Sequence, residues 1–120
     1  MKWDLDKGRP ISPQICEQVC LAIVLGEFLP NDKLLSVREI ALAAGVNPNT
    51  VQKSFDILEN KGILYSQRGS GWYVCEDTSM AKEQLSELYR EKTRLYFDQM
   101  TALGMDVGEI KKYVNDFNDN

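Results

Sequence analysis

Histidine is absent from this sequence of 120 residues. Histidine is the commonest general acid or base in enzymes. The sequence also shows no pattern that pairs a nucleophile with a base. We therefore expect no enzymatic activity, no catalytic residues and no bound cofactor.

Cysteine is scarce, and its number is odd: Cys16, Cys20 and Cys75. Their spacing is not that of a zinc site, so we expect no metal. Cys16 and Cys20 would lie one helical turn apart, which keeps a small redox or metal sensor as one alternative. We favour buried, reduced thiols that pack as small apolar side chains.

Long apolar runs are also missing. The longest, from Val19 to Gly26, stops at Glu27 and is too short to span a bilayer. It begins too late, and has the wrong flanks, for a signal peptide. We expect a cytoplasmic protein with no membrane partner. The content of 43% hydrophobic and 27% charged residues is typical of a globular chain.

The net charge of -4 is unevenly distributed along the chain. Residues 33–75 contain five basic and three acidic side chains, whereas residues 76–120 contain six basic and ten acidic ones. The middle segment is therefore positive inside an acidic protein, and a local positive charge favours contact with nucleic acid.

Capping patterns predict two helices in the first half. Ser12, followed by proline, is typical of an N-cap, and apolar spacing then predicts a helix over residues 12–26. Ser36 and Glu39 form a capping box that starts a second, short helix. Gly45 is expected to end that helix in the left-handed conformation.

Asn47 and Pro48 then predict the cap and first residue of a third helix. Its buried stripe consists of Val51, Phe55 and Leu58. Two short helices joined by a tight turn have the spacing of a helix-turn-helix.

The opposite face of this third helix is polar and contains Asn49, Gln52, Lys53, Asp56 and Asn60. The N-terminal residues of a recognition helix enter the major groove, where asparagine and glutamine can pair with adenine through two hydrogen bonds. A merely solvated face is the alternative for such a pattern taken alone.

A hairpin follows directly. Residues 63–66 and 72–74 alternate about "QRGSG", which predicts two strands joined by a glycine-rich tip. Arg68 at this tip could reach a phosphate or a minor groove. We therefore predict a mostly α fold with a small β-wing, that is, a winged helix-turn-helix domain over residues 1–76.

Residues 77–120 predict a two-helix segment, with Gly104 between the helices and Asp106 as the cap of the last one. Its apolar stripes are too large to be buried within the segment itself. We expect them to join two chains, because a two-fold dimer suits an operator with two half-sites. Packing against the chain's own winged domain is the alternative. The expected dimerisation residues are Leu85, Leu88, Leu95, Tyr96, Leu103, Ile110, Val114 and Phe117.

Residues 34–74 resemble the winged-helix domain of GntR-type bacterial transcription regulators. The resemblance depends on several motifs together: Ser36, Arg38 and Glu39 on the family's Ser-x-Arg-Glu-Leu-Ala, Thr50 and Val51 on its Thr-Val pair, Leu58 to Gly62 on its Leu-Glu-x-x-Gly, and Gly69, Gly71 and Val74 on its wing. The segment "VNPNT" and the short chain are similar to the YtrA subfamily, whose members have two C-terminal helices.

The resemblance implies DNA contacts at Arg38, at residues 47–52 and at the wing tip. Three positions depart from the common pattern: Leu35 replaces a proline, and Pro48 and Gln52 replace arginines found in many members. The predicted DNA-binding residues are Arg38, Asn49, Thr50, Gln52, Lys53, Arg68 and Gly69.

We expect a homodimeric, sequence-specific transcriptional repressor that binds a palindromic double-stranded DNA operator. Asn49 and Gln52 are assigned to base edges, and Arg38, Thr50, Lys53 and Arg68 to the backbone. Asn47 is assigned to helix capping. The alternative in another class is a winged-helix protein-interaction module without DNA binding. The sequence names no small-molecule effector.

Overall fold

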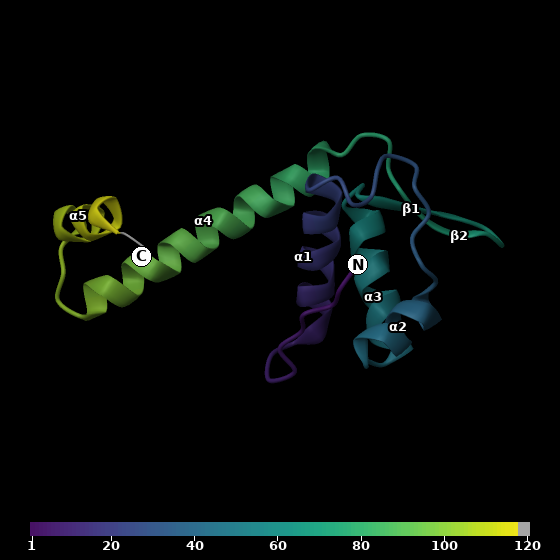
Figure 1. Ribbon diagram of the computed structural model, residues 1–120, viewed down its shortest axis with the longest axis horizontal. Helices are drawn as coiled ribbons and strands as arrows, with labels where there is room; N and C mark the ends of the chain where they lie inside the picture. Colours follow the sequence, from purple (N-terminus) through teal and green to yellow (C-terminus); the bar gives the residue numbers. More distant parts are fainter. Residues whose placement is uncertain (118–120) are drawn as a thin grey trace. The chain divides into compact units, whose positions relative to one another are not determined.

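The computed structural model describes residues 1–117 and divides the chain into two compact units, Met1–Leu85 and a second unit that begins at Ser86. The predicted mostly α fold with a small β-wing is confirmed (Figure 1). The elements in chain order are α1 (Ile11–Val24), α2 (Val37–Ala44), α3 (Pro48–Asn60), β1 (Leu64–Gln67), β2 (Gly71–Val74), α4 (Ser79–Ala102) and α5 (Val107–Asp116).

The core of the first unit forms around α3, which packs against both α1 and α2. The stripe of Val51, Phe55 and Leu58 is buried, as its helical spacing predicted. Phe55 also meets Trp72 of the wing edge to face, with ring centroids 5.4 Å apart. These contacts hold α3 from one side only and leave its polar face in solvent.

The start of α1 differs from the prediction. Pro10 precedes the helix without a side-chain cap, and Ser12 lies inside the first turn. The assignment of Ser12 as the N-cap was wrong because this side chain is buried against α3, where its Oγ lies 2.9 Å from Ser54 Oγ. The helix ends at Val24, and the turn after it contains Gly26 at a φ of 81°.

The predicted caps of α2 and α3 are confirmed. Ser36 Oγ accepts a hydrogen bond from the amide of Glu39 at 3.1 Å, and the Glu39 carboxylate accepts one from the amide of Ser36 at 3.2 Å. Asn47 Oδ1 accepts from the amide of Asn49 at 2.8 Å. Gly45 ends α2 at a φ of 69°, which favours glycine.

The wing is an antiparallel pair in which Tyr65 lies opposite Tyr73, with their rings stacked. A segment ahead of α2 extends this sheet. The amide of Leu34 donates to the carbonyl of Trp72 at 2.9 Å, and Lys33 forms a β-bridge with Tyr73. The loop before the helix-turn-helix is thereby fixed to the wing.

Helix α4 begins in the first unit, where Ala81 and Leu85 are buried. In the second unit the chain turns at Gly104, and Asp106 caps α5 through a capping box with Glu109. Ile110 is fully buried. The large apolar side chains exposed in this unit are Tyr89, Leu95, Tyr96, Leu103, Val107, Tyr113, Val114 and Phe117.

Within residues 1–117, no helix is both long enough and apolar enough to span a membrane.

Candidate nucleic-acid interface

The N-terminal half of α3 presents a polar surface. Asn49, Gln52 and Lys53 are exposed, and Thr50 is half-buried because it lies closer to the helix packing surface. Pro48 at the first helical position has no N–H that needs a partner, and its ring fixes the backbone there. Together with the Asn47 cap it makes the start of α3 rigid. A rigid helix entrance with short polar side chains is suited to the major groove.

Helix α2 places Arg38 next to this entrance. An open depression between α2 and the start of α3 is lined by Arg38, Ala41, Leu42, Gly45, Val46 and Pro48. Arg38 and Leu42 lie one turn apart on the same face of α2, and Leu42 is 86% exposed. The structure therefore brings the predicted Arg38 together with the α3 entrance and adds an apolar neighbour that the sequence did not indicate.

The wing tip is equally open. Arg68 and Gly69 are exposed, and a Cβ at Gly69 would meet nothing within 4 Å, so a DNA backbone could approach closely. The backbone there has a φ of 78°, which explains the preference for glycine.

Lys33 is a second cation on the wing. Its side chain passes over Gly71, with Cε 3.2 Å from the position that a Cβ would occupy there. No sequence pattern indicates that Lys33 lies on the wing, because its place depends on the pairing of the segment before α2 with β2.

Cations at this surface are available to a ligand. In the part of the chain that the structure describes, Arg38, Lys53 and Arg68 form no salt bridge. The positive middle segment therefore presents charge without internal neutralisation, as phosphate contact requires.

The cysteines do not form a reactive site. Cys16 Sγ donates to the carbonyl oxygen of Ser54 at 3.5 Å, and Cys20 is 2% exposed. Burial raises the pKa of Cys16 and raises the pKa of Cys20 to about 12, so both thiols stay protonated near neutral pH. Among residues 1–117, no cluster of histidine, cysteine, aspartate or glutamate could hold a metal ion.

A three-helix core, a turn between α2 and α3, and a hairpin directly after the second of these helices define a winged helix-turn-helix protein. The family model described as "Bacterial regulatory proteins, gntR family" matches residues 12–74. The chain therefore belongs to the GntR family of bacterial regulatory proteins, and its relatives place it in the YtrA-like subfamily.

Two relatives from Bacillus subtilis (strain 168) extend over nearly the whole chain. The HTH-type transcriptional regulator YhcF is 36% identical, over 98% of this chain and 97% of its own. The HTH-type transcriptional repressor YtrA is 32% identical, over 94% of this chain and 88% of its own.

Two solved structures are similar. A GntR family transcriptional regulator from Listeria monocytogenes superposes with a TM-score of 0.80 at 33% identity, over 95% of this chain and all of that one. The DNA-binding domain of AraR in complex with operator ORE1 gives a TM-score of 0.53 at 27% identity, over 62% of this chain and 94% of that one.

These findings confirm that the chain is a transcriptional regulator with a DNA-binding domain and is not an enzyme.

Proposed function

We propose that this protein is a homodimeric repressor that recognises a palindromic DNA operator through the α3 entrance. The observation that carries the proposal is the exposed polar start of α3, fixed by the Asn47 cap and bordered by Arg38. The AraR structure supports the assignment, because that DNA-binding domain is bound to an operator.

The predicted residues divide into two roles. Asn49 and Gln52 read base edges, because an amide side chain can both donate to and accept from adenine. Arg38, Thr50, Lys53 and Arg68 contact phosphate or sugar and set the register. Gly69 allows the wing backbone to approach the DNA. Asn47 already uses its side-chain oxygen to cap α3.

Dimerisation belongs to the second unit. Two of the predicted residues, Leu85 and Ile110, are already covered within a single chain. The partner-facing surface therefore consists of the exposed or half-buried remainder: Leu88, Leu95, Tyr96, Leu103, Val114 and Phe117. Exposed apolar side chains in this number favour a protein partner, and a second copy supplies the two-fold symmetry of a palindrome.

Repression is inferred from the name of the relative YtrA, a transcriptional repressor. A dimer bound across a promoter would block access to it, and bacterial operator DNA places this activity in the cytoplasm.

The test begins with selection of duplexes by the wild-type protein from a random-sequence library. We expect the selected duplex to contain inverted half-sites, and footprinting to show protection centred on two sites about 34 Å apart or a multiple of this distance. A reporter gene downstream of that duplex should fall in expression when the protein is produced. Failure to enrich any sequence would refute DNA recognition and favour the protein-interaction module.

A further inference from the structure

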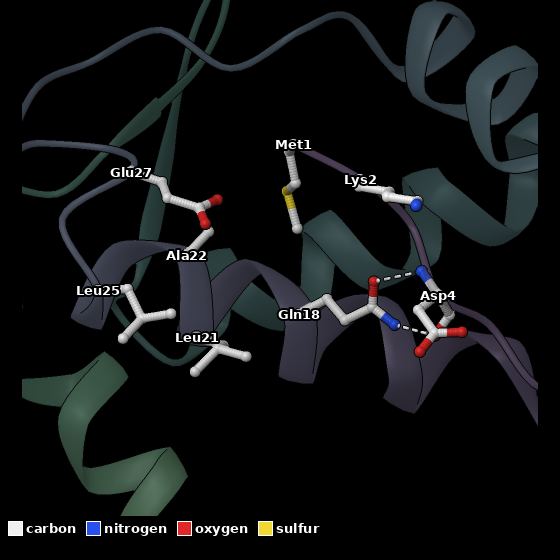
Figure 2. Close-up of a pocket in the computed structure, with 8 residues that line it drawn as sticks. All are labelled: Met1, Lys2, Asp4, Gln18, Leu21, Ala22, Leu25 and Glu27. Atoms are coloured by element: carbon white, nitrogen blue, oxygen red, sulfur yellow. Dashed lines mark hydrogen bonds between the residues drawn. The ribbon is translucent and has the colours of Figure 1, made fainter.

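The segment of residues 1–10, here called the arm, is held along α1 by two glutamine side chains. Gln14 accepts from the amide of Asp6 at 2.7 Å and donates to the carbonyl of Asp6 at 2.8 Å. Gln18 makes the same pair of hydrogen bonds with the backbone of Asp4 (Figure 2). The arm therefore runs antiparallel to α1 in a fixed register.

This register places Lys7 at the helix-turn-helix. Its Nζ donates a 2.9 Å hydrogen bond to the carbonyl oxygen of Gly45, although the two residues are 38 positions apart. Gly45 is the left-handed residue that ends α2, two positions ahead of the Asn47 cap of α3. The ammonium group is thus fixed beside the entrance that we assign to the major groove.

Capping the last carbonyls of α2 accounts for part of this arrangement. It does not use the whole ammonium group, which has three N–H donors, of which Gly45 takes one. The Lys7 side chain is exposed, and within residues 1–117 it has no acidic partner. Because the side chain is exposed beside the start of α3, the remaining donors are free to bind an anion such as a phosphate.

We propose that Lys7 is a further DNA-backbone contact, which donates to a phosphate beside the α3 entrance while Gly45 orients it. This inference rests on the proposed function, since it requires the α2–α3 surface to face DNA. It adds a third element, the arm, to the recognition surface of α2–α3 and the wing.

The arm offers a matched control. Lys2 is also exposed and carries the same charge, but it lies at the other end of α1, where it lines a pocket with Leu21 and Leu25 (Figure 2). Lys2→Gln and Lys7→Gln change the net charge equally. A purely long-range electrostatic effect would therefore be similar for both, whereas a direct phosphate contact would be lost only in Lys7→Gln.

The measurement is titration of the full chain, wild type and variants, against the selected duplex and a scrambled one at several salt concentrations. Lys7→Gln should lower the slope of log affinity against log salt by about one for each bound protomer, that is, by about two for a dimer, on both duplexes. Its loss of affinity should shrink about threefold per protomer between about 50 and 200 mM salt. Lys7→Arg should restore most of the slope, and Lys2→Gln should leave it unchanged.

Thermal unfolding of each variant separates the structural role from the DNA contact. Equal slopes for Lys7→Gln and wild type, with or without a change in stability, would overturn the inference and leave Lys7 as a helix cap. A wild-type protein that binds neither duplex would instead refute the proposed function.

Discussion

Gln52 Nε2 donates a 2.9 Å hydrogen bond to Asp56 Oδ1, one turn further along α3. A glutamine amide has two N–H donors and one acceptor oxygen. With one donor taken by Asp56, the other donor and the oxygen remain, and these are the two groups that pair with N7 and N6 of adenine. Asp56 therefore leaves Gln52 with the donor and the acceptor that the proposed base readout requires.

Substitutions at Asp56 should separate orientation from charge. We expect Asp56→Ala to bind the selected duplex more weakly than Asp56→Asn, by part of the roughly 1–3 kcal/mol that Gln52→Ala would cost, because only in Asp56→Ala does Gln52 lose its support. Both variants lose a negative charge close to DNA, but Asp56→Asn keeps an acceptor. It should raise affinity for selected and scrambled duplexes alike. Titrations with both duplexes test this, and identical behaviour of the two variants would contradict an orienting role.

The neighbouring asparagines of the α3 entrance should have separable roles. Asn47→Ala removes the cap bond to the amide of Asn49 and should lower the free energy of unfolding by about 1 kcal/mol. Asn49→Ala should leave stability nearly unchanged, because its exposed side chain points away from the core.

For DNA binding, Asn49→Ala should have the larger effect and Asn47→Ala the smaller one. Asn49→Ala should weaken binding to the selected duplex much more than to the scrambled one, whereas Asn47→Ala should act on both only through stability. Chemical denaturation and DNA titration of the two variants check this pair of expectations. Uniform weakening on both duplexes by Asn49→Ala would mean that it contacts the backbone.

Local features of the fold could be predicted from the sequence because their partners lie within a few residues. The capping box of Ser36 and Glu39 and the cap at Asn47 are of this kind. Ser12 was misassigned because its partner, Ser54, lies 42 residues away. A serine before a proline has the pattern of a cap, and only the packing of α1 on α3 turns it into a buried partner.

The same limit applies to the candidate site. Residues on one helix, such as Asn49 and Gln52, share a surface by periodicity alone. Lys7 lies beside the start of that helix only because of the arm along α1, and Lys33 lies on the wing only because of the pairing with β2. Neither placement leaves a periodic pattern in the sequence.

The free energy of unfolding should fall in alkaline solution because of Cys20. Burial raises its pKa from 9.0 to about 12, so the native thiol keeps a proton that the unfolded thiol releases between these values. The contribution is complete below about pH 9 and is lost as the pH rises towards 12. Cys20→Ala should flatten this fall, in denaturant titrations at a series of pH values, although it lowers stability near neutral pH through lost packing.

Measurements of DNA affinity test whether the cysteines also regulate binding. Wild type and the Cys16→Ala, Cys20→Ala double variant should bind the selected duplex equally under reducing and oxidising conditions. Redox-dependent binding that disappears in the double variant would establish a thiol switch instead.

Leu95 and Leu103 should control the oligomeric state. Leu95 lies on α4 and Leu103 in the turn directly after it, and they are 56% and 79% exposed, so replacing them by glutamate creates no buried charge within one chain. At a dimer interface the same charges would be desolvated next to apolar side chains, at a cost of several kcal/mol. Leu95→Glu, Leu103→Glu should therefore give monomers in sedimentation at micromolar concentration, where wild type gives dimers.

Thr101→Glu is the matched control. Thr101 is exposed on the side of α4 that faces away from Leu88 and Leu95, so a charge placed there should leave the dimer intact. The cut that isolates the DNA-binding unit belongs after Leu85, since Ala81 and Leu85 are part of the first unit's core. A chain ending there should be monomeric, and its affinity for a single half-site should match that of the double variant. Wild type that sediments as a monomer, or a double variant that stays dimeric, would place the interface elsewhere or remove it.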